Sequence, residues 1–178
     1  IGRMADPVKI VDEVEKLLSR QEDMAGKRVL VTAGPTQEPI DAVRHISNRS
    51  SGKMGFAIAQ AAADRGAAVT LISGPTWLKP PHNVEFIPVT TALEMRESVL
   101  EHLESTDILV KSAAVVDFKP RRQSREKIKK EEADLTVELE RNPDILAEVG
   151  KRKGNLILVG FAAETDNLKE YGRKKLAE

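Results

Sequence analysis

Cysteine is absent from the 178 residues of this sequence. These residues therefore contain no thiol nucleophile, no disulfide and no cysteine-ligated zinc or iron–sulfur site. Aromatic residues make up only 3% of the chain, so a platform of rings for stacking bases is not expected. Neither sign of charge is in excess, because 28 Lys and Arg residues balance 28 Asp and Glu residues. A protein that binds nucleic acid by neutralising phosphates usually carries a basic surplus, so nucleic acid is not an expected partner.

Long hydrophobic runs are also missing. The longest run, residues 156–163, is interrupted by Gly160 and is far shorter than the ~20 residues of a membrane-spanning helix. The composition, 40% hydrophobic and 31% charged, is typical of a folded globular domain. We expect a cytoplasmic protein that has no membrane partner.

Apolar periodicity predicts the fold class from residue 27 onward. Compact β-branched runs alternate with segments whose apolar residues recur at helical spacing. The runs are almost wholly apolar, as expected for strands whose two sheet faces are both covered. The pattern predicts an α/β, Rossmann-like parallel sheet with helices on both faces. Strands are expected at 28–32, 68–72, 84–89, 107–110 (running into 113–116) and 156–159, and helices at 51–65, from Thr91, from an Asn142 cap with Pro143 as first helical residue, and from Thr165.

The first 24 residues follow a different pattern. Residues 6–20 are predicted to form an amphipathic helix with Ile10, Val14 and Leu17 on one face, and the segment after it is polar. We therefore divide the chain into an appended helix and linker at 1–24 and a main domain at 25–178.

Ligands in open parallel sheets bind beyond the carboxyl ends of the strands. The segments expected to carry chemistry are therefore 33–52, 73–82, 113–130 and 160–166. Gly34 directly follows the first strand, but the dinucleotide fingerprint G-x-G-x-x-G is absent, and a plain tight turn is an equally good interpretation.

The segment 44–55 is more informative. Two hydroxyls and a glycine, those of Ser50, Ser51 and Gly52, stand at a helix start, where free N–H groups and the helix dipole favour an anion. The pattern predicts a phosphate or carboxylate site, and a capped helix with solvated cations is the alternative. Asn48 adds a neutral amide donor of the kind that stabilises a developing oxyanion.

A basic stretch follows the fourth predicted strand. Residues 119–130 hold seven Lys and Arg residues against one acid, Glu126, without apolar periodicity. Such a stretch is often a solvated surface loop, but its place at a ligand-binding edge favours a long basic lid over a polyanion such as a triphosphate. Asp117, just before it, is either a turn residue or a contact for ribose, base or metal. From the residues alone we expect a domain that binds a phosphorylated ligand, with a nucleotide as the favoured candidate.

Five strings in the sequence carry a specific resemblance. Together they closely resemble bacterial phosphopantothenate–cysteine ligase, the CTP-dependent ligase of coenzyme A biosynthesis, over about residues 25–178. The strings are VTAGPTQEPIDAVRHISNRSSGKMG at 31–55, AAVVD at 113–117, EKIKK at 126–130, NPDI at 142–145 and GFAAET at 160–165.

The resemblance implies a reaction in two steps. The carboxylate of 4′-phosphopantothenate attacks the α-phosphate of CTP, which gives an acyl-cytidylate and pyrophosphate. The amine of L-cysteine then displaces CMP. The resemblance also implies that Mg²⁺ accompanies the nucleotide and that the ligase forms a homodimer.

In bacteria this ligase usually forms the C-terminal half of a bifunctional protein, and the N-terminal half is an FMN-containing decarboxylase. The resemblance therefore implies that 1–24 is the end of the decarboxylase half and that this chain binds no FMN. Family members continue past the last predicted helix, which implies that the ligase domain at 25–178 is truncated at its C-terminus.

The resemblance also implies roles for particular residues. Asn48 and Arg44 are expected to handle the acyl intermediate, and Lys127 is expected to bind the triphosphate of CTP. No metal ligand is assigned. The acyl substrate is expected at Ser50, Ser51 and Gly52, and the other CTP-binding positions are Ala114, Asp117, Asn142, Pro143, Asp144, Ile145, Phe161 and Lys175.

Two other functions stay open at this point. A nicotinamide-dependent oxidoreductase would use the same fold, although the missing glycine fingerprint disfavours it. A noncatalytic assembly module would hold a larger enzyme together without binding a nucleotide.

Overall fold

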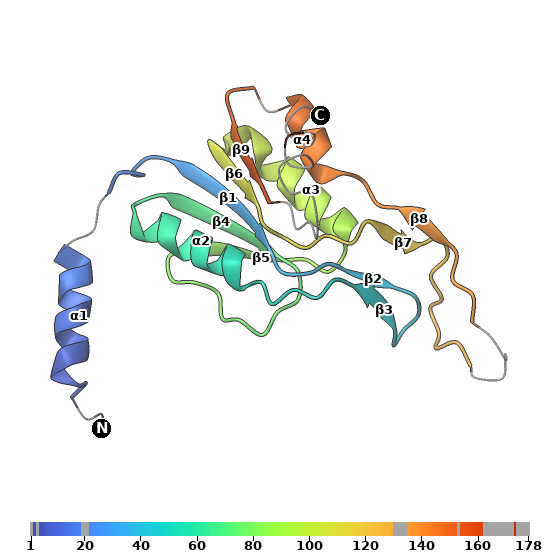
Figure 1. Cartoon of the computed structure of the whole chain (residues 1–178), viewed down its shortest axis with the longest axis horizontal. Coiled ribbons are helices and arrows are strands. Elements are labelled where there is room, and N and C mark those ends of the chain that lie inside the picture. Colours follow the sequence, from blue (N-terminus) through green and yellow to red (C-terminus); the bar gives the residue numbers. More distant parts are fainter. Residues whose placement is uncertain are drawn as a thin grey trace.

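The computed structural model describes residues 2, 4–18, 22–129, 135–152, 154–161 and 173. Within them, five strands form one sheet in the order β5-β4-β1-β6-β9, and every neighbouring pair is parallel (Figure 1). The predicted parallel sheet is therefore confirmed, and each predicted strand is present. Their bounds are β1 (Arg28–Ala33), β4 (Ala68–Ser73), β5 (Val84–Pro88), β6 (Ile108–Lys111) and β9 (Ile157–Gly160).

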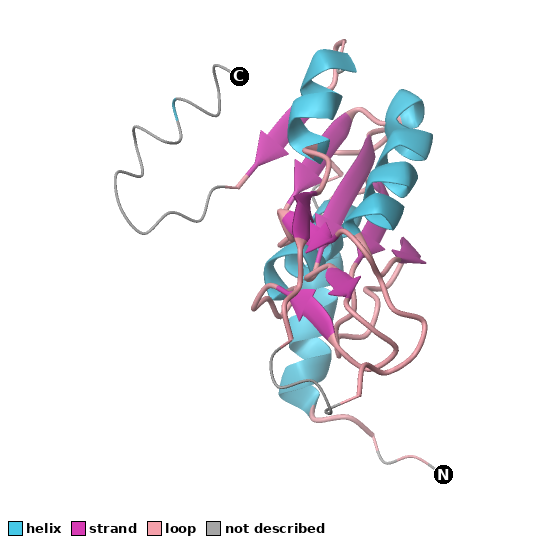
Figure 2. Ribbon diagram, turned by 90° about the vertical axis from the view of Figure 1, so that its right-hand side faces the viewer, coloured by secondary structure: helices cyan, strands magenta, loops and turns pink. Residues whose placement is uncertain are grey.

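Helices cover both faces of this sheet, as the sequence predicts (Figure 2). Val29 and Val31 of β1 pack with helix α2 (Lys53–Asp64) in one apolar cluster. Leu30, which points to the other face, belongs to a second cluster with helices α3 (Ala92–His102) and α4 (Ile145–Arg152). A short 3-10 helix, η1 (Leu103–Ser105), continues α3.

The start of α4 differs from the prediction. Asn142 was expected to cap this helix with Pro143 as its first residue, but α4 begins at Ile145 and the Asp144 side chain accepts from the backbone N–H of Ala147 at 3.0 Å. The reason is that Asn142 has other partners. Its side-chain nitrogen donates to the carbonyl of Val116 at 2.8 Å, so the Asn142 side chain is bonded to the connection after β6 and does not cap the helix.

Two small antiparallel ribbons project from the carboxyl edge of the sheet (Figure 1), and the sequence predicted neither. Each strand has only three residues, too few to show a period of two. The first ribbon joins β2 (Gln37–Pro39) to β3 (His45–Ser47), and the second joins β7 (Phe118–Pro120) to β8 (Leu139–Arg141). β2 contacts β7, so the two ribbons form one arm.

The predicted N-terminal helix is present as α1 (Pro7–Leu18) and stands away from the sheet (Figure 1). Its apolar side chains Val8 and Val11 are 67% and 53% exposed. The division at residue 24 stays a prediction. The helix expected from Thr165 lies outside the described residues.

Candidate active site

The carboxyl ends of β1 and β6 are the place where the winding of the sheet reverses. From β1 the chain moves outward through β4 to β5, whereas β6 and β9 lie on the opposite side of β1. Ligands of open α/β sheets bind in the crevice outside such a switch point. The two connections that begin there, 34–52 after β1 and 112–117 after β6, contain half of the predicted site residues.

These two connections are hydrogen-bonded to each other through residues 34–36 and 114–116. The N–H of Ala114 donates to the carbonyl of Gly34 at 2.9 Å, and the N–H of Thr36 donates back to the carbonyl of Ala114 at 3.3 Å. The hydroxyl of Thr36, a fully buried residue, accepts from the N–H of Val116 at 2.9 Å. Residues beyond β6 thus continue beside those beyond β1, although β6 itself ends at Lys111 and the predicted run into 113–116 is not a regular strand.

Three glycines allow the backbone to pack closely at this edge. Gly34 and Gly52 have φ of 71° and 74°, and a Cβ on Gly52 would lie 3.4 Å from the Cα of Gly34. A Cβ on Gly55, in α2, would lie 2.5 Å from the Cβ of Ala33. A tight turn, a close backbone approach and close helix–strand packing are the tasks of the glycines in G-x-G-x-x-G.

This glycine arrangement was missed from the sequence. Gly52 and Gly55 have the G-x-x-G spacing, but residues 35–51, which carry the β2–β3 ribbon, separate them from Gly34. The sequence did contain a signal for it: one glycine after β1, and a pair of glycines at the start of the next helix. A continuous fingerprint is therefore not required for this geometry.

Ser50, Ser51 and Gly52 lie directly before α2, as predicted. The hydroxyl of Ser50 accepts from the N–H of Gly52 at 3.3 Å, and that of Ser51 accepts from the N–H of Lys53 at 3.5 Å. Gly52, the N-cap residue, offers no side chain to the first turn. The anion site at this helix start stays a prediction.

Asn48 is held against the connection from β6. Its side-chain nitrogen donates to the carbonyl of Val115 at 3.0 Å and lies 3.4 Å from the carbonyl oxygen of Ala114. The neighbouring Ser47 hydroxyl donates to the carbonyl of Thr36 at 2.8 Å. The structure therefore brings the predicted acyl-handling residue Asn48 to the predicted CTP-binding residue Ala114, and Asn48 does not cap α2.

Arg44 is held by a buried carboxylate. The Asp41 side chain, which has no exposed surface, accepts from Arg44 Nε at 2.9 Å and from the N–H groups of Val43 and Arg44, both at 2.8 Å. The Arg44 guanidinium and these N–H groups hold the pKa of Asp41 well below its usual range. Arg44 Nη2 also donates to the carbonyl of Ile128 at 2.9 Å, so this arginine bridges the β2–β3 turn and the basic stretch.

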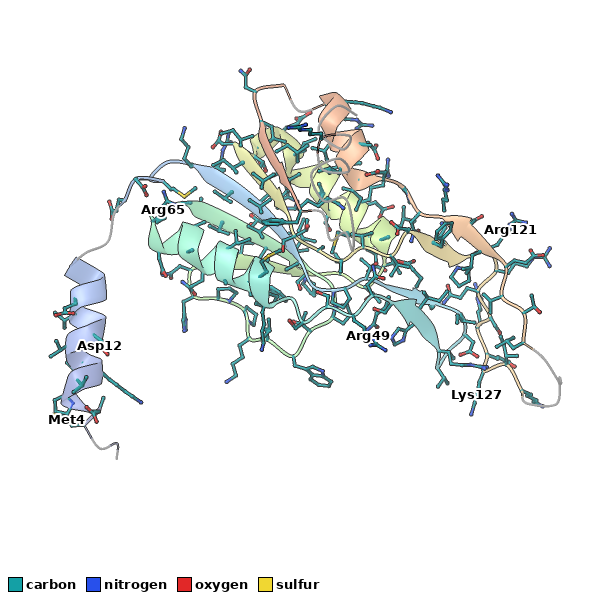
Figure 3. The ribbon with its side chains drawn as sticks, in the orientation of Figure 1. Met4, Asp12, Arg49, Arg65, Arg121 and Lys127 are labelled. Atoms are coloured by element: carbon teal, nitrogen blue, oxygen red, sulfur yellow. The ribbon has the colours of Figure 1, made fainter. Side chains whose placement is uncertain are left out.

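The basic stretch is more structured than a single long loop. Its first two residues belong to β7, where Lys119 Nζ lies 3.5 Å from Glu140 Oε1; Arg121 follows β7, and its Nη1 lies 3.6 Å from Glu138 Oε2. Figure 3 shows Arg121 and Lys127 on opposite sides of the arm, while Arg49 lies nearer the sheet. The Lys127 side chain is exposed, and a lid function stays a prediction.

Of the remaining predicted CTP residues, the structure brings Asp117 and Asn142 together. The N–H of Asn142 donates to the carbonyl of Asp117 at 2.8 Å, which places these two residues side by side. Asn142 Oδ1 is buried and has no hydrogen-bond partner among the described residues.

The other predicted CTP residues lie elsewhere. Phe161, 52% exposed, follows β9 at the same edge of the sheet. Ile145 is 2% exposed within the apolar core, Asp144 caps α4, Pro143 lies between Asn142 and Asp144, and Lys175 is outside the described residues.

Neither a metal cluster nor a membrane span occurs in the described part of the chain. No three His, Asp or Glu side chains there are grouped to hold a metal ion. No helix there is both long and apolar enough to cross a membrane.

Comparison with known proteins assigns the family. A family model described as the DNA/pantothenate metabolism flavoprotein C-terminal domain matches residues 24–178. The chain belongs to this family. The resemblance found in the sequence is thereby confirmed, and a nicotinamide-dependent oxidoreductase is not favoured.

Relatives of this flavoprotein C-terminal domain family are close. The coenzyme A biosynthesis bifunctional protein CoaBC of Bacillus subtilis is 49% identical over 179 residues, which cover 99% of this chain and 44% of that protein. The protein of the same name from Escherichia coli K12 is 48% identical over 178 residues, 98% of this chain and 44% of that protein. The chain thus spans less than half the length of the curated relatives it matches.

A solved structure agrees with the fold. The crystal structure of the C-terminal domain of CoaBC has a TM-score of 0.79 and 47% identity to this chain, and the match covers 87% of this chain and 74% of that one. The Rossmann-like sheet is therefore shared by this family member and its solved relative.

Proposed function

We propose that this chain is the ligase unit that joins 4′-phosphopantothenate to L-cysteine at the expense of CTP, through an acyl-cytidylate. One observation supports this most. The two connections expected to hold the acyl group and the nucleotide, 34–52 and 112–117, are bonded to each other at the switch point of the sheet. A reaction that couples an acyl carboxylate to a nucleotide α-phosphate needs both held side by side.

On the nucleotide side, the buried Oδ1 of Asn142 supports a cytosine. The exocyclic amino group of cytosine is a hydrogen-bond donor, and a buried acceptor without a partner is a suitable group to receive it. Asp117 and Ala114 then lie along the ribose and base, and Lys127 approaches the triphosphate.

Magnesium enters this proposal as part of the substrate, MgCTP. Mg²⁺ keeps several waters and is commonly bound through substrate phosphates plus one or two carboxylates. The described residues hold no cluster for a resident ion, which is compatible with delivery by the nucleotide.

The chemistry is an acyl transfer in two displacements. In the first, a carboxylate oxygen forms a bond to the α-phosphorus, and the bond from that phosphorus to pyrophosphate breaks. In the second, the cysteine nitrogen forms a bond to the acyl carbon, the amine loses a proton, and CMP leaves with the former carboxylate oxygen. Charge develops on the acyl oxygen in the second step, where the neutral amide of Asn48 is the donor we assign to it.

We further propose a homodimer formed through the arm, in the cytoplasm. Val43, Phe118 and Leu139, all on the projecting ribbons or their turn, are 64%, 44% and 44% exposed. Apolar side chains gathered on one projection suit contact with a second copy. In the longer bifunctional proteins, we expect the decarboxylase unit to precede α1.

The deciding experiment measures CMP release in the presence of MgCTP, 4′-phosphopantothenate and L-cysteine. Release that requires all three supports the ligase, and release independent of cysteine contradicts it. Isothermal titration with MgCTP separates the ligase from a noncatalytic module, because a module would give no binding heat.

A further inference from the structure

The buried carboxylate of Asp41 joins the β2–β3 turn to the basic segment, residues 119–130. Asp41 lies in the turn between β2 and β3, and besides Arg44 it accepts from the backbone N–H of Ile128 at 3.1 Å. Ile128 directly follows Lys127, the residue assigned to the triphosphate. The Asp41 side chain has no exposed surface, so water does not compete for these bonds.

We propose that Asp41 is a positioning residue that fixes Lys127 and Arg44 relative to each other, so that the nucleotide-binding and acyl-handling groups stay in register. This inference rests on the proposed function for the roles of Lys127 and Arg44. The attachment itself rests on the geometry alone.

The basic segment touches the turn at two points that flank Lys127. The N–H of Ser124 donates to the carbonyl of Ile40 at 3.0 Å, and the Ile128 backbone is bonded in both directions, through its N–H to Asp41 and through its carbonyl to Arg44. The backbone on both sides of Lys127 is therefore attached, although its side chain is free to reach a ligand.

A hollow of about 540 Å³ lies beside this attachment, lined by Ile40 of the turn, by Ser124 and Ile128 of the basic segment, and by Val137 and Glu138 before β8. Among the described residues, this hollow leaves the segment without close packing on that side, so its position depends on the polar attachment.

The attachment needs a carboxylate of this length. Asp41 accepts only donated hydrogens, from three backbone N–H groups and from the Arg44 guanidinium. An asparagine would turn an N–H₂ group toward at least one of these donors, and a buried N–H facing another N–H has no partner. A glutamate is one methylene longer and has no free space in a fully buried site.

Asp107 provides a matched control at the opposite, amino edge of the sheet. It also accepts from a backbone N–H, that of Arg28 at 2.8 Å, and pairs with the guanidinium of the same residue. It therefore has the same chemistry, a carboxylate bonded to an arginine and a backbone amide, without any link to the basic segment.

The first test needs no substrate. Hydrogen exchange of the Ile128 amide, and the rate of trypsin cleavage after Arg125, Lys127 and Lys129, are compared in wild type, Asp41→Asn and Asp107→Asn. We expect Asp41→Asn to accelerate both by about tenfold or more, the scale of a lost hydrogen bond to a charged group, and Asp107→Asn to leave both unchanged. Equal rates in wild type and Asp41→Asn overturn the attachment.

The second test measures the dissociation constant for MgCTP in the full protein, with KM and kcat for the cysteine step. We expect Asp41→Asn to weaken MgCTP binding by tenfold to about a hundredfold, the range seen when a reacting group is misplaced by an ångström, with Asp107→Asn unchanged. Tight MgCTP binding by wild type and by Asp41→Asn alike overturns the positioning role. No MgCTP binding by wild type overturns the proposed function instead, and the first test still decides the attachment.

A second variant covers the case in which Asp41→Asn does not fold. Ile128→Pro removes the N–H that donates to Asp41 and fixes φ at position 128, and it leaves the pair between Asp41 and Arg44 in place. We expect weaker MgCTP binding in this variant too, and faster trypsin cleavage after Arg125 and Lys129, because trypsin does not cut a lysine bond that is followed by proline. Wild-type values for both contradict the proposal.

Discussion

The two edges of the same parallel sheet differ in how they hold their polar groups. At the amino edge, Arg28 pairs with Asp107, and both side chains remain partly exposed, at 55% and 37%. At the carboxyl edge, polar side chains are buried within the fold. Every buried polar residue in the described part of the chain belongs to this edge or its connections: Thr32, Thr36, Glu38, Asp41 and Ser73.

Burying a polar group is unfavourable unless it finds a partner, so each of these residues constrains a neighbour. The Glu38 carboxylate accepts from the N–H of Ala92 at 2.8 Å, and the Thr36 hydroxyl accepts from that of Val116. These bonds join segments that are far apart in the chain. The contrast shows that the sheet's aliphatic core makes the scaffold, whereas buried polar groups set the geometry of the edge where ligands bind.

The largest effect on activity is expected from substitution of Asn48, at the carboxyl edge. Asn48→Ala should slow product formation by about 10²–10³-fold, the scale of one oxyanion donor, while pyrophosphate is still released once per site and the acyl-cytidylate accumulates. Quenched-reaction mass spectrometry detects the intermediate. Asn155→Ala, at the amino edge, should behave as wild type. Asn48→Asp has no side-chain N–H to donate, so a near-normal rate of product formation without trapped intermediate in this variant would show that the Asn48 amide is not the donor to the acyl oxygen.

Loss of the Lys127 charge should have the next largest effect. Lys127→Gln removes a cationic hydrogen bond to phosphate, which typically contributes ~1.5–3 kcal/mol when well formed. We expect a higher KM for MgCTP in pyrophosphate release. Lys151→Gln, at the C-terminal end of α4, is the matched control. An unchanged rate for Lys127→Gln at subsaturating CTP would show that the basic segment does not contact the triphosphate.

Two helical glycines test the packing at the carboxyl edge. Gly55→Ala should lower the free energy of unfolding by ~1–3 kcal/mol, because the new Cβ would lie 2.5 Å from that of Ala33. Gly150→Ala, in α4, meets nothing within 4 Å and should raise it by ~0.4–1 kcal/mol. Urea unfolding of both variants measures the difference. Changes of the same sign would contradict the close approach of α2 to β1.

The smallest expected effect concerns acid. The pKa of Asp41 and that of Asp107 are both lowered in the folded protein from the usual 3.8, Asp41 chiefly by Arg44 and Asp107 chiefly by the Arg28 N–H. A lowered folded pKa gives stability that is present above about pH 4 and is lost as the pH falls through the folded pKa. Asp41→Asn and Asp107→Asn should therefore each show a shallower loss of stability in acid.

Urea unfolding at pH 7, 4 and 3 measures this acid dependence. Both variants should share it, whereas only Asp41→Asn should also change nucleotide binding. An acid dependence equal to that of wild type in Asp41→Asn would mean that the carboxylate is not held by its neighbours.

The sequence predicted the scaffold better than the edge. Apolar runs such as Leu30 and its neighbours located every strand of the main sheet, and Thr91 was correctly predicted as a cap, since its hydroxyl accepts from the N–H of Glu94. Asn142 was predicted as a cap on the same local reasoning and is not one. The Thr91 hydroxyl bonds locally, within its own helix, as the capping pattern predicts. The Asn142 side chain instead bonds to the carbonyl of Val116, a contact that no local pattern contains.

What the sequence determined by itself is the alternation of strands and helices, the order in which connections reach the carboxyl edge, and, through its motifs, the family. These follow from periodicity and composition, which act over a few residues. The tertiary structure alone decided that Asn48 meets Val115 and that Asp41 meets Ile128. Asn48 and Val115 are 67 positions apart, and Asp41 and Ile128 are 87 positions apart. These hydrogen bonds depend on how the sheet brings the connections together, and no local preference encodes them.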